Sequence, residues 1–183
     1  MKRIAVTVFL SIGLLASCSD GDSSDREPAR EGAAALGDRM TTVDEVSSWI
    51  RDRAGDCSEL TEQDRSDLRG FVGTDVVGLY EPYVAEWATC SVSPDFPKVA
   101  ILLFTGDGQR EFQESWREAM ADGSVADGPS VAFGNGFAVS AGFLGVSKLD
   151  LYYLRCDYDD PKVHQLPADV PGCVFANPEH GHH

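Results

Sequence analysis

Basic residues are scarce in this sequence, and their scarcity excludes a large class of partners. The 183 residues include 15 Lys and Arg against 30 Asp and Glu, which gives a formal net charge of −15 at pH 7. A surface of this charge repels phosphate backbones and anionic lipid head groups. We therefore expect no binding to nucleic acid.

The motifs of common catalytic sites are also missing. The sequence contains no G-x-S-x-G, no S-x-x-K and no H-E-x-x-H, the patterns of serine hydrolases, β-lactamase-type enzymes and zinc proteases. Pairs of catalytic carboxylates, as in glycosidases, leave little trace in a sequence. The sequence therefore favours a non-catalytic binding or interaction module, and an enzyme of unrecognised type stays as an alternative.

Long hydrophobic runs are absent except at the N-terminus. There, Lys2 and Arg3 precede an uninterrupted run of apolar and small residues over 4–15, the arrangement of a secretory signal peptide. As a helix this run reaches about 18 Å, short of the ~30 Å hydrocarbon core of a bilayer. We therefore expect an export signal at residues 1–17 and no transmembrane helix.

The residues at the end of this run resemble the lipobox of bacterial lipoproteins. Leu15-Ala16-Ser17-Cys18 places a branched apolar residue and two small residues before a cysteine. The resemblance implies cleavage before Cys18 and a diacylglyceryl group on its thiol. Two acyl chains give stable anchoring, where one gives only marginal binding. The alternative is an ordinary cleaved signal followed by an unrelated cysteine. The lipobox predicts a protein anchored to the cell membrane on its extracytoplasmic side, with the bilayer as its first partner.

Four cysteines remain beyond the lipobox, and an even number in an exported chain indicates disulfides. Three pairings are possible. We favour Cys57–Cys90 with Cys156–Cys173, because each bond then closes a modest loop within one half of the domain. A metal site is the alternative, but none of the spacings is C-x-x-C.

Composition divides the rest of the chain into a tether, one domain and a tail. Residues 18–40 are rich in Asp, Ser, Gly and Ala without periodicity, as in flexible linkers. We expect a single domain over residues 41–176 and a histidine-containing tail over 177–183.

Helical periodicity and turn signals predict the elements of this domain. A capping box at Thr42 opens a helix that ends at Gly55, and a weaker helix follows over 61–71. Further predictions are an extended segment over 83–92, a buried strand over 99–104 and a helix over 106–121.

A hairpin and a last helix complete the prediction. In the hairpin, Asn135-Gly136 forms a type I′ turn between strands 131–133 and 137–143, the second strand half-buried. The pattern over 146–156 is ambiguous, and we favour a helix because Val146, Leu149, Tyr153 and Cys156 would then share one face. The order of elements gives an α+β domain, in which helices pack on a small antiparallel sheet.

The segment 43–143 loosely resembles small actinobacterial lipoproteins of uncharacterised function. The shared features are a helix before Cys57, a strand through Cys90, the strand 99–104, the helix containing Trp116 and the Gly-Asn-Gly strand connection. The resemblance implies an extracytoplasmic lipoprotein and no assigned activity.

Two groups of side chains are candidate binding sites. The C-terminal His180, His182 and His183 could bind Zn²⁺, Cu²⁺ or Ni²⁺, since neutral imidazoles are good ligands for these ions; a solvated polar terminus is the alternative. Tyr80, Tyr83 and Trp87 could form an aromatic platform, and burial under a helix is the alternative. We expect an unidentified protein, cell-wall or small-molecule partner.

Overall fold

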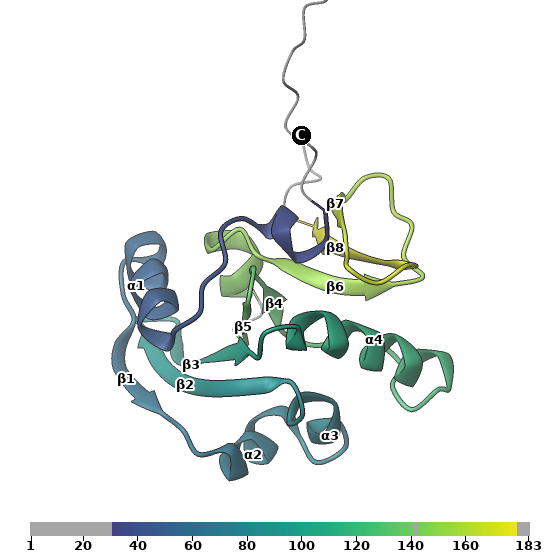
Figure 1. The fold of residues 1–183 in the computed structure, drawn as a ribbon. Helices are drawn as coiled ribbons and strands as arrows, with labels where there is room; N and C mark the ends of the chain where they lie inside the picture. The colour runs from purple at the N-terminus through teal and green to yellow at the C-terminus, as the bar shows by residue number, and fades with distance from the viewer. Residues whose placement is uncertain (1–30, 141–142, 179–183) are drawn as a thin grey trace, which may run out of the picture.

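The computed structural model describes residues 31–140 and 143–178 (Figure 1). Its strands form one antiparallel sheet of eight strands, in the order β1-β2-β3-β5-β4-β6-β8-β7. The strands are β1 Ser58–Glu62, β2 Val84–Val92, β3 Phe96–Phe104, β4 Ala132–Phe133, β5 Phe137–Val139, β6 Tyr152–Cys156, β7 His164–Pro167 and β8 Cys173–Asn177. The expected α+β class is confirmed.

Helices cover both faces of this sheet. The helical segments are η1 Gly32–Leu36, α1 Val43–Ala54, η2 Arg65–Asp67, α2 Leu68–Val72, α3 Val77–Tyr80, α4 Gly108–Ala121 and η3 Leu144–Lys148. In Figure 1, α1 lies on one side of β2 and β3, and α2 and α3 lie on the other. The α4 helix packs into the same core as α2 and α3, and α1 packs into the other. The chain therefore has helices on two sides of one sheet.

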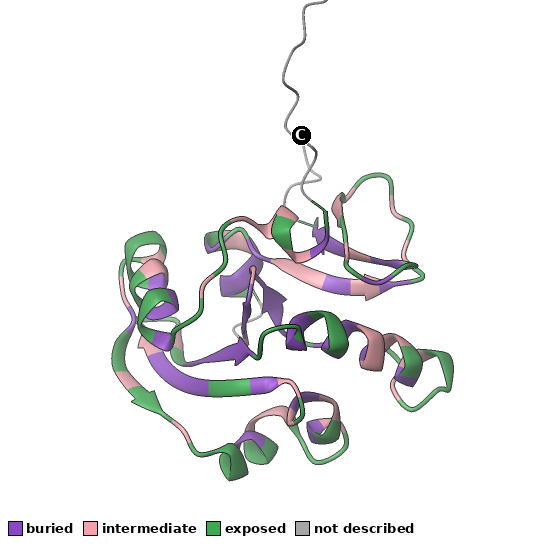
Figure 2. Ribbon diagram, viewed as in Figure 1, coloured by how far each residue is buried: buried purple, intermediate pink, exposed green. Residues whose placement is uncertain are grey.

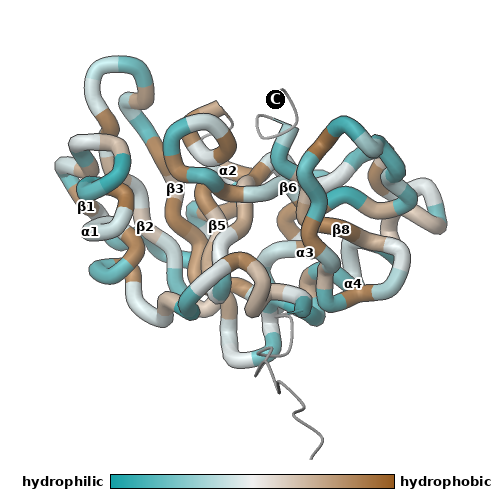
Figure 3. Tube along the Cα trace, turned by 90° about the horizontal axis from the view of Figure 1, so that it is seen from above, coloured by the Kyte–Doolittle hydropathy of each residue, from teal (hydrophilic) through white to brown (hydrophobic). Residues whose placement is uncertain are grey.

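The sheet separates two hydrophobic cores. One core packs Phe112 and Trp116 of α4 against Leu102 and Phe104 of β3. The other packs Val46 and Ile50 of α1 against the opposite face. Figure 2 shows β3 and β5 buried along most of their lengths, and Figure 3 shows hydrophobic residues concentrated there. The predicted burial of strand 99–104 on both faces is confirmed.

Both disulfides form with the favoured pairing. Cys57–Cys90 joins the segment before β1 to β2, and Cys156–Cys173 joins β6 to β8, where the two cysteines are directly opposite. The bonds therefore secure the two ends of the sheet independently.

The two long predicted helices, α1 and α4, are confirmed, and α1 begins and ends at the residues predicted to cap it. Thr42 accepts from the N–H of Glu45, and the Glu45 carboxylate accepts from the N–H of Thr42, so the capping box is formed. Gly55 ends α1 at φ 85°. The α4 helix begins at Gly108, two residues after the predicted start.

Two shorter helix predictions are wrong in part. Residues 58–62 form the strand β1, so the helix predicted over 61–71 is reduced to the short segments η2 and α2. The helix predicted over 146–156 ends at Lys148, and residues 152–156 form β6. In both cases a disulfide-linked neighbouring strand supplies hydrogen-bond partners, and this pairing outweighs a weak helical periodicity.

The hairpin is confirmed, but its turn type and its burial differ. Gly136 has φ 87°, whereas Asn135 has no positive φ, so the turn is not type I′ and matches type II at that position. The second strand is short and buried on both faces, because β5 lies in the middle of the sheet between β3 and β4.

The folded structure begins before residue 41, which corrects the predicted end of the tether. Ala33 N–H donates to the Asp169 carboxylate at 3.1 Å, and Asn135 donates from Nδ2 to the Gly37 carbonyl at 2.8 Å. Arg39 donates to the Gly106 carbonyl at 2.7 Å. Residues 32–40, which we call the N-terminal arm, are therefore part of the domain.

Candidate functional site

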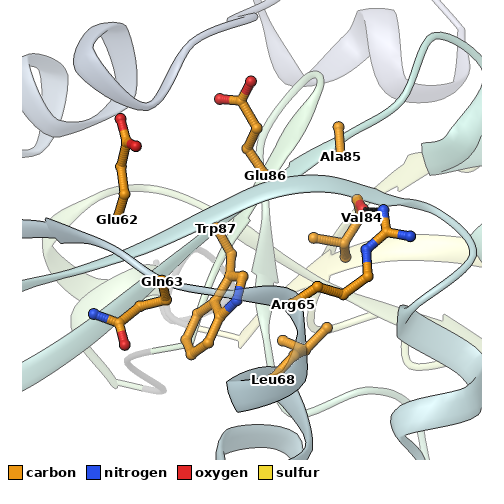
Figure 4. A pocket seen from close by; sticks show the side chains of 8 residues that line it. All are labelled: Glu62, Gln63, Arg65, Leu68, Val84, Ala85, Glu86 and Trp87. Carbon is orange, nitrogen blue, oxygen red and sulfur yellow. Dashed lines mark hydrogen bonds between the residues drawn. The ribbon is translucent and has the colours of Figure 1, made fainter.

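A pocket of about 260 Å³ lies at the edge of β2, beyond the point where β1 ends (Figure 4). The last registered pair between the two strands is Glu62–Ala88, so residues 84–87 of β2 have no partner in β1. The lining residues are Glu62, Gln63, Arg65, Leu68, Val84, Ala85, Glu86 and Trp87. The departure of the chain from the sheet after Glu62 therefore opens the pocket.

Three hydrogen bonds fix the chain that crosses this edge. Gln63 N–H donates to the Trp87 carbonyl at 3.0 Å, and the Arg65 guanidinium donates to the Val84 carbonyl at 2.8 Å. The Trp87 indole N–H donates to the Asp64 carbonyl at 3.0 Å. Because its indole N–H is bound to backbone, the Trp87 ring has a fixed orientation.

One side of the pocket is apolar. Leu68 is fully buried, Val84 is 3% exposed, and Trp87 is 4% exposed and packs on Phe71 with ring centroids 5.7 Å apart. These side chains belong to the core under α2 and α3. The apolar wall is therefore preformed and rigid.

The other side carries two exposed carboxylates. In Figure 4, Glu62 and Glu86 point to one side of β2 and Trp87 points to the other. The register gives the reason: Glu62 pairs with Ala88, so its side chain shares a face with Glu86, two residues before Ala88. Within residues 31–140 and 143–178, neither carboxylate has a hydrogen-bond or ion-pair partner. Two acidic groups are thus available to a ligand at the open edge of β2, on the face opposite the apolar wall.

A larger cavity, of about 350 Å³, lies under the N-terminal arm, between α1 and the loop before β6. Two of its charged groups pair with each other: Arg53 is 3.2 Å from Asp150, and it also lies 5.0 Å from the centroid of the Trp49 ring. Because these polar groups already satisfy one another, we regard the pocket at β2 as the better candidate site.

The predicted aromatic platform does not form an exposed surface. Tyr80 is 1% exposed and packs against Phe112 and Trp116, with ring centroids 5.0 and 5.6 Å away. Burial raises the pKa of the Tyr80 phenol. Tyr83 is half-buried against Phe112, and Trp87 is buried. The alternative of burial under helices is what the structure shows, and Trp87 alone reaches the pocket at β2.

Two other predicted sites lie outside the described residues: the lipidation site Cys18 and the histidines His180, His182 and His183. In the part of the chain that the structure describes, no three His, Cys, Asp or Glu side chains are grouped to hold a metal ion. Across the same residues, no helix has the length and apolar character to cross a bilayer.

Sequence reasoning missed Glu62 and Glu86 because it placed Glu62 in a helix. A signal was present: Cys57 was expected to pair with Cys90, which lies in a predicted strand. A disulfide to a strand favours a neighbouring strand after Cys57, and Ser58–Glu62 contains the β-branched Thr61.

Searches against protein-family models, curated proteins and solved structures found no match to this chain.

Proposed function

We propose that the protein is a lipid-anchored, extracytoplasmic binding module, and that its pocket at β2 binds a Lys or Arg side chain of a partner protein. The supporting observation is the pair of carboxylates, Glu62 and Glu86, which lie on one face at the open edge of β2 and have no partner among the described residues. The lipobox at Leu15–Cys18 supports the anchor and the location.

The shape and the chemistry of the pocket suit such a side chain. Lys and Arg have a long flexible stem and a cationic head, so the stem can cross the open edge of β2 while the head reaches the two carboxylates. A volume of about 260 Å³ accommodates one side chain rather than a folded surface. The net charge of −15 would also attract basic partners and accelerate their association.

NMR titration of the indole N–H signals tests the ligand. The chain has three tryptophans, of which only Trp87 lines this pocket, so Trp49 and Trp116 are internal references. We expect a tri-lysine peptide to shift the Trp87 signal and a tri-glutamate peptide to leave all three unchanged. A shift with tri-glutamate alone would instead indicate an anion site at Arg65 and would refute the proposal.

Substitution of the two carboxylates provides the second arm of the test. The double variant Glu62→Gln/Glu86→Gln should weaken tri-lysine binding at least ten-fold. The double variant Glu111→Gln/Glu118→Gln, at two exposed positions of α4, removes the same two negative charges and should change binding less than two-fold. Equal weakening in both variants would mean that only the overall charge of the protein attracts the peptide.

The anchor is tested by the mass of the mature protein. We expect the native protein to begin at Cys18, with a diacylglyceryl group on its sulfur and acyl chains such as palmitate. The variant Cys18→Ala should leave the membrane fraction. An unmodified Cys18 in the native protein would contradict the proposed anchor and leave the ligand test unaffected.

A further inference from the structure

The strand β1 is an open edge of the sheet (Figure 1). It is the first strand in the sheet order and pairs with β2, and no other strand of the described residues lies against its outer side. Four of its five residues are exposed, and Leu60 is half-buried. At the other end of the sheet, by contrast, η1 of the N-terminal arm contacts β7. An open edge offers backbone N–H and C=O groups to another chain.

The register shows which backbone groups of β1 face outward. Gln63 donates its N–H to the Trp87 carbonyl, so these residues are a hydrogen-bonded pair at the end of the β1–β2 ladder. Hydrogen-bonded and non-hydrogen-bonded pairs alternate along an antiparallel ladder. Thr61 therefore directs its N–H and C=O towards β2, whereas Leu60 and Glu62 direct theirs outward. An added strand would form its hydrogen bonds with Leu60 and Glu62.

The side chains along this edge suit a basic segment. Leu60 and Glu62 alternate with Thr61, so they share the face of the sheet on which Glu86 lies. Leu60 packs at the border of the core under α1. In an added strand, the residues opposite Glu62 and Leu60 also lie on this face, with one residue between them. A basic side chain opposite Glu62 would thus meet the two carboxylates, and an apolar side chain would meet Leu60.

A second copy of the chain suits the same edge poorly. Each copy has a formal net charge of −15, and β1 itself contains Glu59 and Glu62, so two copies repel each other. The register of β1 also shifts between Ser58 and Thr61, with Glu59 at φ 56°. Short, charged and bulged edge strands are the means by which natural proteins avoid pairing with copies of themselves. Charge complementarity therefore favours a basic chain over a second acidic one.

We propose that the partner binds by adding an extended segment to β1 as a ninth, antiparallel strand. Reading from N to C, this segment has a basic residue opposite Glu62, any residue next, and an apolar residue opposite Leu60. All strand pairs of the sheet are antiparallel, and this pairing is slightly more stable than the parallel one. The inference rests on the proposed function, to which it adds the mode of binding and the pattern that is recognised.

NMR titration with the capped peptide Thr-Lys-Thr-Val-Thr and two methylated forms tests the backbone pairing. In the proposed register, the Val N–H points to β1 and the central Thr N–H points away from it. N-methylation of Val should weaken binding roughly ten-fold or more, because it removes a hydrogen bond and blocks close approach. N-methylation of the central Thr is the matched control and should change binding less than two-fold. Equal affinity of all three peptides would refute strand addition.

Hydrogen exchange supplies a readout within the unaltered protein. Saturating peptide should slow exchange at the amides of Leu60 and Glu62 roughly ten-fold or more, and leave Thr61, whose N–H faces β2, as the internal reference. Unchanged exchange at both amides would refute strand addition, while a tri-lysine shift at Trp87 would still support the proposed function. Protection of these amides without peptide, rising with protein concentration, would assign the edge to a second copy and refute the basic segment as its occupant.

Discussion

At the scale of the residue, a short sequence pattern predicted the cap at the start of α1. Thr42 and Glu45 form a reciprocal cap, in which the Glu45 carboxylate accepts the N–H groups of Thr41 and Thr42 at 2.8 and 3.1 Å. All partners of this cap lie within one short stretch of chain, so the sequence pattern alone predicted it.

The pH dependence of stability should reflect this cap. Hydrogen bonds from the backbone of Thr41 and Thr42 lower the pKa of Glu45 below its ordinary value of 4.5. A carboxyl whose pKa is lower in the folded state stabilises the fold above its unfolded pKa. This contribution is lost as the pH falls through the folded value. In urea unfolding from pH 7 to pH 3, Glu45→Gln should therefore be less stable than the unaltered protein at pH 7, and the difference should shrink towards pH 3.

The variant Thr42→Ala removes the hydroxyl part of the cap and leaves the charge of Glu45 in place. Loss of the threonine oxygen should cost about 1 kcal/mol of unfolding free energy. An identical pH profile in Glu45→Gln and the unaltered protein would show that the carboxylate does not contribute.

At the scale of the element, partners distant in sequence decided what local patterns left open. The N-terminal arm has the composition of a linker, yet it is held by Asp169, whose carboxylate also accepts from Gln113 Nε2 at 2.6 Å. Ala33 of the arm and Asp169 are 136 residues apart. Composition correctly identified the arm as rich in small and polar residues. It could not show that the Asp169 carboxylate accepts a hydrogen bond from the arm and holds it in place.

Gly32 should be essential to the docking of this arm. It has φ 61°, and a Cβ at this position would overlap the Asp169 carboxylate. We expect Gly32→Ala to lower the unfolding free energy by about 1–2 kcal/mol from backbone strain alone, with a further loss from the overlap. Hydrogen exchange should also accelerate at the amides of residues 33–40.

Gly37→Ala is the matched control. Gly37 has φ 103°, but a Cβ added there would meet no other atom within 4 Å, so this variant carries backbone strain without the overlap. Equal effects of the two substitutions on exchange in the arm would contradict the role assigned to the Asp169 contact.

At the scale of the whole molecule, two disulfides secure opposite ends of one sheet. Cys57–Cys90 closes a separation of 33 residues near β1, and Cys156–Cys173 closes a separation of 17 residues between β6 and β8. Between them lie the two cores, which share the buried strands β3 and β5. The pocket proposed as the binding site lies at one of these ends, beside β2.

Removal of each disulfide should therefore destabilise the protein by a similar amount. The chain-entropy relation gives about 3–4 kcal/mol for each bond, with the longer loop at the upper end. The double variants Cys57→Ala/Cys90→Ala and Cys156→Ala/Cys173→Ala should show these losses in urea unfolding. A loss below about 1 kcal/mol for either pair would mean that the sheet holds that end without the covalent bond.

The sequence by itself determined the α+β class, the α1 and α4 helices and the buried strand 99–104, whereas it left three disulfide pairings possible. These features depend on residues close in the chain or on strong periodic patterns, which act before any tertiary contact forms. Only the tertiary structure decided that residues 58–62 and 152–156 are strands, because their partners are distant strands of the sheet. The same pairing placed Glu62 near Glu86, so the proposed site at β2 arises from strand register, which no local pattern encodes.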